Sequence, residues 1–470
     1  MITRTIDTIA YMCGGELFSA QDKNIEITGV VTDSRSISPA CLFVPLVGER
    51  FDGHAYAAAS LTAGAAATLW QRDRGPAPAG GGVILVEDTL TALQQLSSAY
   101  LKEVAPRVVA VTGSNGKTTT KDIITALLET QFKVHKTQGN FNNHIGLPLT
   151  VLSMDYDVEI AVLEMGMSSR GEIALLSRLA TPDVAVITNI GESHLLQLGS
   201  RKEIARAKLE IVEGLQPGGL LIYNGDEPLL AEVLAEPGFR VPEGLRTFRF
   251  GQSEDNGDYP TGVMAHGGGM TFTSHLHSEP ALTLPLPGQH NVINALAALA
   301  VARHYGVTAE NMAEGLLGLK LTGMRIELIE AGSGLVMLND AYNASPTSMR
   351  AAIDVLQSMK CSGRRIAVLG DMLELGPDEV LFHRQIGQYL DPELTGEVYT
   401  YGPLAAHIAE AAAERFGDGR VFAFSDKEAL THALTAKCSM KDIVLFKASR
   451  GMRLEEVLHR LRDYSADDSN

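Results

Sequence analysis

The sequence predicts an α/β protein of three domains: a small α/β N-terminal domain, a central P-loop domain with a parallel sheet, and a C-terminal Rossmann-like domain. Three observations support this prediction. The chain has 470 residues, which corresponds to about three domains. Apolar segments alternate with helical patterns along most of the chain, as in parallel sheets covered by helices. A glycine-rich loop, 113–116, joins an apolar strand to a helical run. We place the domains at residues 1–87, 88–321 and 322–470.

Composition argues against several classes of protein. The net charge of −17 argues against nucleic acid as the main partner, because phosphate backbones require a basic surface. No run approaches the roughly 18 apolar residues that a membrane helix needs, and Asp7 and Gly14 interrupt any signal-peptide core. The cysteines form no C-x-x-C pair, so we expect a cytoplasmic protein with reduced thiols at Cys13, Cys41, Cys361 and Cys438.

The N-terminal domain shows short segments of the β type. Residues 25–32 and 41–46 are the clearest of them. A Gly/Pro-rich break follows at 75–82, and residues 83–87 predict a short strand.

The most informative segment is 108–120, V-V-A-V-T-G-S-N-G-K-T-T-T. Apolar residues enter a glycine-rich loop, and a helix-compatible run follows at 121–130. The N–H groups of such a loop suit a polyphosphate; Lys117 would reach the β- and γ-phosphates and the Thr118 hydroxyl would ligate Mg²⁺. Val111 replaces the first glycine of the usual G-x-x-x-x-G-K-[ST] pattern, so the loop is the shorter T-G-x-N-G-K-T form. The alternative is a glycine-rich turn with a chance Lys-Thr pair.

The rest of the central domain alternates in the same way. Residues 245–287 hold short β-like runs with several Gly and Pro, and they predict an antiparallel insertion or a sheet edge. Helices at 91–104 and 288–304 flank three predicted strands, at 158–164, 183–188 and 220–223.

Polar side chains follow two of these strands. Glu164 ends the strand I-A-V-L-E, and His194 lies in T-N-I-G-E-S-H after the next strand. Ligands of open α/β sheets lie beyond the carboxyl ends of the strands, so both side chains are placed to bind Mg²⁺ beside the P-loop. The alternatives are a surface acid and a solvated histidine.

Three further segments are polar but ambiguous. The loop G-N-F-N-N-H-I-G-L-P, with Asn140 and Asn143, can bind ligand oxygens or simply form turns. Lys208 lies in a helical run, where a solvated lysine paired with a nearby acid such as Glu210 or Glu213 is the ordinary interpretation. Asn291, at the start of an apolar helix with Asn294, is either an N-cap or a contact to a base.

The C-terminal domain alternates again but lacks G-x-G-x-x-G, so it is not predicted to bind a dinucleotide. Polar loops at 339–348, 370–376 and 447–450 follow three of its strands and predict one shared rim, a second substrate face. The predicted strands are 335–338, 365–369, 397–401, 421–424 and 442–446, and the predicted helices are 347–359, 379–390, 404–416, 427–436 and 454–464.

The combined motifs resemble the Mur ligases, ATP-dependent amide-bond-forming enzymes of peptidoglycan synthesis with three domains. The motifs are T-G-S-N-G-K-T, G-N-F-N-N-H-I-G-L-P, L-E-M-G, T-N-I-G-E-S-H, A-K at 207–208 and G-Q-H-N-V-I-N-A-L-A. The resemblance covers essentially the whole chain. It implies that the central domain is an ATPase domain and that an acyl phosphate precedes the amide bond.

Two stretches resemble the branch of the family that adds D-alanyl-D-alanine to UDP-N-acetylmuramoyl-tripeptide: N-D-A-Y-N-A-S-P-T-S and L-G-D-M-L-E-L-G. The D-N-P-R of the diaminopimelate-adding relative is absent from the sequence. T-D-S-R, F-V-P-L and D-G-H near the N-terminus resemble the UDP-binding domain of both ligases. The implied partners are these two small molecules, and a monomer is expected. Met324 and Ser345 depart from the family's usual Gly and Asn.

The resemblance also implies roles for individual residues. Lys117, Lys208 and His194 would be catalytic. Thr118, Glu164, His194 and Lys208 would hold two Mg²⁺ ions, with Lys208 carbamylated by CO₂. The ATP-binding residues would be Gly113, Ser114, Asn115, Gly116, Lys117, Thr118, Thr119, Asn291, Asn294, Arg325 and Asp340. The substrate-binding residues would be Ser34, Arg35, Asp52, Gly53, His54, Asn140, Asn143, Tyr342, Asn343, Ser345, Asp371 and Glu374.

Two other functions stay open at this point. One is a different ligase of the same superfamily, such as the diaminopimelate-adding enzyme or a folate polyglutamate ligase. The other is a P-loop NTPase switch or motor, which would hydrolyse ATP without an acceptor. The short loop and the asparagine-rich segment weigh against the second.

Overall fold

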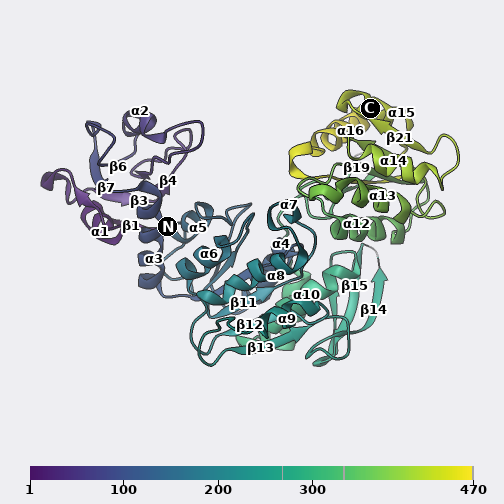
Figure 1. Ribbon diagram of the computed structural model, residues 1–470, viewed down its shortest axis with the longest axis horizontal. Coiled ribbons are helices and arrows are strands. Elements are labelled where there is room, and N and C mark those ends of the chain that lie inside the picture. Colours follow the sequence, from purple (N-terminus) through teal and green to yellow (C-terminus); the bar gives the residue numbers. More distant parts are fainter. Residues whose placement is uncertain (267, 332–333, 468–470) are drawn as a thin grey trace.

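The computed structural model describes residues 1–266, 268–331 and 334–467. Three parts, each with its own sheets and helices, follow one another along the chain. Figure 1 shows the N-terminal part (purple) and the C-terminal part (green to yellow) at opposite ends, with the central part between them. The predicted α/β class with three parts is therefore confirmed, while the exact domain boundaries stay predictions. Among the described residues, no helix has the length and apolar character needed to cross a membrane.

The N-terminal part is a small sheet with helices on both sides. Its five strands run in the order β2-β7-β6-β5-β4, and β1 pairs separately with β3. The segment 25–32 is not one strand, because Gly29 adopts a φ of +81° and sends β3 and β4 into different sheets. The elements are β1 (Thr3–Thr5), α1 (Ile6–Met12), β2 (Glu16–Leu17), η1 (Ala20–Asp22), β3 (Glu26–Thr28), β4 (Val30–Val31), β5 (Leu42–Phe43), η2 (Gly53–Tyr56), α2 (Ala57–Thr62), β6 (Ala67–Gln71) and β7 (Gly82–Val86).

Helix α3 (Thr89–Val104) connects this part to the central one. Its buried Leu93 and Leu96 belong to one apolar core that contains strands of both sheets. Asp88 caps the helix by accepting the Thr91 N–H at 2.7 Å. The core is thus continuous across the predicted boundary at 87/88.

The central sheet has six parallel strands in the order β13-β12-β11-β8-β10-β9. Val109 and Val111 of β8 pack toward α4 and α10, whereas Val108 and Ala110 face α5 and α6. This alternation covers both faces of the sheet. The elements are β8 (Arg107–Thr112), α4 (Lys117–Leu128), β9 (Val134–Lys136), α5 (Gly146–Leu152), β10 (Ile160–Glu164), α6 (Glu172–Ala180), β11 (Val184–Ile187), α7 (Leu195–Leu198), α8 (Arg201–Leu209), η3 (Glu210–Glu213), β12 (Leu220–Asn224), α9 (Pro228–Leu234), β13 (Arg246–Phe250), α10 (Gln289–His304) and α11 (Ala309–Leu317).

Both interpretations of residues 245–287 are confirmed. β13 is the parallel edge strand of the central sheet, and β14 (Pro260–His266), β15 (Gly269–Ser274) and β16 (His277–Leu284) form an antiparallel sheet. Phe272 and Leu284 of this sheet pack against α10. A buried ion pair, Arg303 to Asp258 at 2.5 Å, ties the start of the insertion to the same helix. The insertion therefore supports the helix that carries Asn291 and Asn294.

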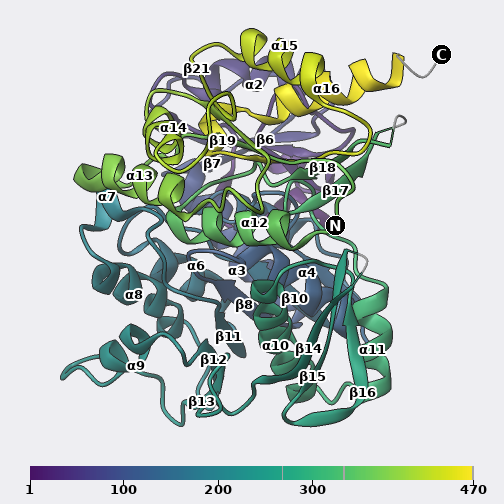
Figure 2. The same cartoon turned by 90° about the vertical axis from the view of Figure 1, so that its right-hand side faces the viewer.

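The C-terminal part is a six-stranded sheet in the order β17-β18-β22-β19-β20-β21, with only β17 antiparallel. Helices α12, α13 and α14 cover one face, and α15 and α16 cover the other. Figure 2 shows α12 at the edge that faces the central part. The elements are β17 (Glu327–Glu330), β18 (Val336–Asn339), α12 (Pro346–Ser358), β19 (Arg365–Gly370), η4 (Gly376–Asp378), α13 (Glu379–Tyr389), β20 (Glu397–Tyr401), α14 (Ala406–Ala413), β21 (Val421–Phe424), α15 (Lys427–Lys437), β22 (Ile443–Lys447), η5 (Arg450–Met452) and α16 (Glu455–Asp467).

The segment that joins α11 to β17 is fastened to the helix that follows the phosphate loop. Asp122 of α4 is buried and accepts the Thr322 N–H at 2.7 Å. The same carboxylate pairs with Lys136 at 2.7 Å, and the neighbouring Lys121 donates to the Thr137 carbonyl at 2.9 Å. Beyond Thr322, Met324 and Ile326 adopt positive φ angles of 61° and 49°.

The Arg303–Asp258 pair provides a test of how the insertion is held. Asp258→Asn should lower the free energy of unfolding of the central part by about 3 kcal/mol, because it leaves the Arg303 charge buried without its partner. Urea unfolding followed by circular dichroism measures this. Asp157→Asn, which removes the exposed Lys133 pair, is the control and should leave the transition nearly unchanged. Equal transitions in the two variants would contradict the assigned role.

Candidate functional site

A cavity of about 910 Å³ lies between the central and C-terminal parts. It is lined by the ends of strands from both sheets and by the first turn of α10. Fifteen of the residues expected from the sequence line it, namely Ser114, Asn115, Gly116, Lys117, Thr118, Thr119, Asn143, Glu164, His194, Asn291, Asn294, Arg325, Asp340, Tyr342 and Asn343. Residues from separate predicted motifs thus meet in one cavity, and their roles stay predictions.

The P-loop has the expected conformation, and two of its glycines are needed for it. Gly113 has a φ of +146°, and a Cβ there would lie 1.9 Å from the Thr188 hydroxyl. Gly116 has a φ of +78°, and a Cβ there would lie 2.5 Å from the Asn294 side-chain oxygen. Both constraints exclude larger side chains. The loop is further held by Asn189, whose side-chain oxygen accepts the Asn115 N–H at 2.9 Å.

Lys117 is the first residue of α4, and its ammonium folds back over the loop. It donates to the carbonyls of Gly113 at 2.8 Å and Ser114 at 3.3 Å. Burial lowers the pKa of Lys117 to about 8, and the charge of Glu164 partly opposes that shift. The loop thus combines a helix N-terminus with one cation, an arrangement suited to a polyphosphate.

Several buried polar atoms around the loop have no partner in the described part of the chain. They are the Ser114 hydroxyl, the Asn115 side-chain NH₂ and one oxygen, Oε2, of Glu164. The other Glu164 oxygen accepts from Asn142 at 2.7 Å. Unpaired buried polar atoms are costly, so they indicate where a polar ligand completes the site.

The Mg²⁺ prediction fits a site that the nucleotide itself would complete. The described residues contain no group of three or more His, Cys, Asp and Glu side chains placed to hold a metal. Mg²⁺ is commonly held by one or two carboxylates together with substrate phosphates. Glu164, with a free oxygen, and the neighbouring Thr118 provide such a partial set.

His194 lies on the same rim, as predicted, because β8 is flanked directly by β10 and β11. Its backbone is left-handed, with a φ of 64°, and its Nδ1 is 2.8 Å from Oε2 of Glu374 in the C-terminal part. Glu374 is also left-handed, and its carbonyl accepts the Leu196 N–H at 3.1 Å. This pair of loops joins the two parts above the cavity.

Lys208 is buried and not solvated. It is 1% exposed, and no described residue accepts a hydrogen bond from its ammonium. Burial, and then the positive charge of Lys117, hold its pKa well below the usual value. The solvated pair with Glu210 or Glu213 is wrong, because these glutamates bind Arg170 and Arg178 instead. Lys208 lies next to the cavity and does not form its wall.

The C-terminal part contributes polar groups from one rim, since β18, β22 and β19 are neighbours in the sheet. The Arg325 guanidinium lies 4.1 Å from the centre of the Tyr342 ring. Asp340 accepts from the buried Lys447 at 2.5 Å. Ser345 caps α12 and donates to the Asn115 side-chain oxygen at 3.1 Å, so this part touches the P-loop directly.

The first turn of α10 lies across the cavity from the C-terminal rim. Asn291 is not the N-cap, because the helix begins at Gln289 after Gly288. Its side chain donates to the Pro287 carbonyl at 2.8 Å and accepts from Asn294 at 3.2 Å. Met270, Leu286 and Ile293 add apolar lining beside these amides, which suits a flat heterocycle such as adenine.

Other predicted substrate residues lie outside this cavity. Asp371 is buried and accepts the Ala405 N–H at 2.6 Å, so its carboxylate is already engaged. Glu374 contacts His194 as described, Ser345 lies behind the cavity wall, and Asn140 is exposed on its loop. Their roles toward a substrate stay predictions.

The N-terminal candidates form a separate group. His54 is buried, 2.6 Å from Asp52 through Nδ1, and packs edge-on against Trp70. Gly53 allows a close approach, because a Cβ there would lie 2.7 Å from the Leu46 backbone. Of the other two, Ser34 is half-buried, and Arg35 is exposed and pairs with Asp33 at 2.7 Å.

Sequence reasoning missed Asn142, Glu172, Asp226 and His290, all of which line the cavity. Asn142 was the middle asparagine of the recognised loop, and His290 was part of the recognised G-Q-H-N run, so both signals were present. Burial lowers the pKa of His290 to about 4, which keeps it neutral. Nothing in the sequence distinguishes Glu172 or Asp226 from surface acids.

Comparison with known proteins agrees with this geometry. Family models match the chain over residues 26–101 (Mur ligase family, catalytic domain), 111–302 (Mur ligase middle domain) and 324–450 (Mur ligase, glutamate ligase domain). The UDP-N-acetylmuramoyl-tripeptide–D-alanyl-D-alanine ligase of Bacillus subtilis is 52% identical over 461 residues, which cover 98% of this chain and 99% of that protein.

Solved structures give the same picture. MurF from Acinetobacter baumannii superposes with a TM-score of 0.86 at 30% identity, covering 98% of this chain and 99% of that chain. MurF ligase from Thermotoga maritima in complex with ADP superposes with a TM-score of 0.81 at 31% identity, covering 94% and 98%.

The lowered pKa of Lys117 predicts how nucleotide binding depends on pH. Below its pKa of about 8 the lysine is charged and attracts phosphate; above it, binding must take up a proton. ATP affinity should therefore fall about tenfold from about pH 7 to about pH 9. Calorimetric titration at constant Mg²⁺ measures it. Lys117→Arg, whose guanidinium stays charged, should show a flat profile. A flat profile in the unmodified protein would contradict this interpretation.

Proposed function

The chain belongs to the Mur ligase family, and from this premise we propose that it is an ATP-dependent ligase that adds D-alanyl-D-alanine to UDP-N-acetylmuramoyl-tripeptide. The observation that carries the proposal is the cavity in which the P-loop faces the strand-end loops of the C-terminal part. The two substrates are those for which the Bacillus subtilis relative is named. A role in cytoplasmic peptidoglycan precursor synthesis, performed by a monomer, completes the proposal.

The reaction must first activate a carboxylate, which is a poor electrophile. Transfer of the γ-phosphoryl group of ATP to the tripeptide carboxylate forms an acyl phosphate and releases ADP. The amine of D-alanyl-D-alanine then attacks the acyl carbon, an amide bond forms, phosphate leaves and the amine loses a proton. Like charges 4 Å apart repel by about 4 kcal/mol at an effective dielectric of 20, so the first step needs positive charge at the phosphates.

The residues of the P-loop are suited to that task. Lys117 is already oriented over the loop, and the amides of the α4 N-terminus add their partial charge. Thr118, Glu164 and His194 would hold Mg²⁺, and Glu164 already presents an unpaired oxygen. When bound, Mg²⁺ would neutralise charge on the phosphate oxygens. The ADP in the Thermotoga maritima relative supports a nucleotide at this loop.

Lys208 is best explained as a carbamate. A free ammonium close to Lys117 and to bound metal would be repelled, and burial already favours the neutral amine. The neutral amine is the form that adds CO₂, which yields a carbamate anion and releases a proton. That anion would then serve as a further oxygen ligand for Mg²⁺ and would remove the like-charge repulsion with Lys117.

The remaining cavity residues are assigned to the nucleotide and to the amine substrate. Asn291 and Asn294 would contact adenine, with Arg325 and Asp340 closing the nucleotide site from the C-terminal part. The rim of Tyr342, Asn343, Ser345, Asp371 and Glu374 would receive D-alanyl-D-alanine, and the N-terminal part would bind the UDP moiety.

The decisive experiment is phosphate release from ATP. With UDP-N-acetylmuramoyl-tripeptide and D-alanyl-D-alanine together, release should be fast and should match amide formation; with either one missing it should be slow. Lys117→Ala should lower turnover by several orders of magnitude, since it removes the cation at the phosphates. Equal hydrolysis without an acceptor would support the NTPase alternative. Faster turnover with UDP-N-acetylmuramoyl-dipeptide and diaminopimelate would support the related ligase.

The carbamate has its own test. Lys208→Ala should lose most activity, and acetate should partly restore it by occupying the vacated space. Bicarbonate should stimulate CO₂-depleted unmodified enzyme but not the variant. Exposed ion pairs contribute at most about 1 kcal/mol, so a surface lysine would be dispensable. Near-normal activity of a folded Lys208→Ala protein would rule the carbamate out.

A further inference from the structure

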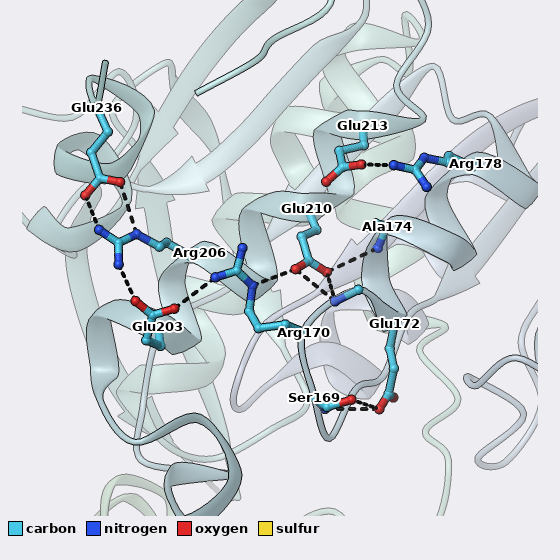
Figure 3. Close-up of polar contacts among 11 residues, drawn as sticks. Ser169, Arg170, Glu172, Ala174, Arg178, Glu203, Arg206, Glu210, Glu213 and Glu236 are labelled. Atoms are coloured by element: carbon cyan, nitrogen blue, oxygen red, sulfur yellow. Dashed lines mark hydrogen bonds and ion pairs between the residues drawn. The ribbon is translucent and has the colours of Figure 1, made fainter. Parts of the chain in front are cut away.

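Glu210 is a buried carboxylate two residues beyond Lys208, at the junction of α8 and η3. Its side chain is 7% exposed and points toward the start of α6 (Figure 3). Its two oxygens accept the Gly171 N–H at 3.0 and 2.8 Å, and one of them accepts the Ala174 N–H at 3.4 Å. Arg170 completes the set through Nε at 2.7 Å.

These contacts join two segments that lie far apart in the sequence. The carboxylate satisfies orphan N–H groups at the start of α6 and lies at the positive end of that helix. Arg170 also reaches Glu203 of α8 at 2.9 Å. Arg206 in turn binds Glu203 and Glu236, so a series of ion pairs runs along the exposed side of α8 (Figure 3). Glu210 is the buried centre of this network.

The segment that Glu210 holds is part of the proposed active site. It runs from Glu164, at the end of β10, to Glu172, which lines the cavity. Glu172 fixes its own turn by accepting from the Ser168 and Ser169 N–H groups at 3.1 and 3.0 Å. One carboxylate thus connects the helix of Lys208 to the loop between two cavity acids.

We propose that Glu210 is a positioning residue for the ligase reaction, because it locks the helix that carries Lys208 against the loop that follows Glu164. This proposal rests on the function proposed above. Lys208 has no described hydrogen-bond partner of its own, so its place depends on where its helix is held. Without Glu210, the two segments stay joined only farther from Lys208 and Glu164, through Ser177, which accepts the Gly214 N–H at 3.1 Å, and through ion pairs on the surface.

The chain offers a matched control on the same turn. Glu213 also pairs with an arginine, Arg178, but that pair is exposed and contacts no backbone of the loop (Figure 3). Glu210→Gln keeps the size of the side chain but leaves only one accepting oxygen for several donors. Glu213→Gln makes the same chemical change but leaves the contacts of Glu210 with Arg170, Gly171 and Ala174 intact.

The experiment measures carbamate and metal dependence together. The holoenzyme is equilibrated with ¹³C-bicarbonate, the carbamate carbon is observed by NMR, and phosphate release is titrated with Mg²⁺. In Glu210→Gln the carbamate signal should fall severalfold, and the Mg²⁺ concentration for half-maximal rate should rise about tenfold or more. Added bicarbonate should restore part of the rate, and the KM for D-alanyl-D-alanine should stay unchanged. Glu213→Gln should match the unmodified enzyme in every readout.

A second variant, Arg170→Met, tests the proposal if Glu210→Gln does not fold. Arg170→Met leaves the backbone bonds of Glu210 intact but removes its link to Glu203, and Arg170 is about half exposed. It should shift the Mg²⁺ dependence in the same direction by a smaller factor. Unchanged carbamate and Mg²⁺ dependence in folded Glu210→Gln or Arg170→Met would overturn the positioning role. Absence of carbamate in the unmodified enzyme would instead overturn the assignment of Lys208.

Discussion

The parallel pairing of β8 with β10 on one side and β11 on the other is the constraint on which the site depends. Because parallel strands end at the same edge, this pairing brings Lys117, Glu164 and His194 together although they lie far apart in the sequence. The C-terminal sheet repeats the arrangement with β18, β22 and β19. The cavity forms where these two edges face each other, so both sheets must fold correctly before any residue can act.

The buried charges and unpaired polar atoms of the site lower the stability of the fold. Lys208 and Lys447 are buried and Lys117 is half-buried, and desolvation lowers the pKa of all three, so the protein environment disfavours their charged forms. Buried charges and unpaired polar atoms cost free energy that apolar side chains would not. Lys117, Lys447 and the unpaired atoms of Ser114, Asn115 and Glu164 line one cavity, which is typical of a site whose ligands supply the missing partners. The function proposed for the site, rather than the stability of the fold, explains why these polar residues are there.

Much of the site could be predicted because strand-loop-helix patterns and the family motifs fix backbone position. The direction in which the Lys208 side chain points was harder to predict, because A-R-A-K-L-E-I contains several charged residues. Its spacing from the buried Ile204 and Ile211, four residues before and three after, was the available signal for an inward direction. The sequence also could not show which glutamate pairs with which arginine, because that depends on contacts between α6 and α8.

The attachment of the interdomain segment to α4 has a mechanical consequence. Thr322 is fixed to Asp122, one helical turn beyond the P-loop, and the residues with positive φ follow it at once. A rigid rotation of the C-terminal part about this point would displace each atom in proportion to its distance from the pivot. The contact at the pivot would be kept, whereas the contacts of Glu374 with His194 and Leu196 would change. The lever arm thus allows the contacts beside the cavity to open while the C-terminal part stays attached to the helix that follows the P-loop.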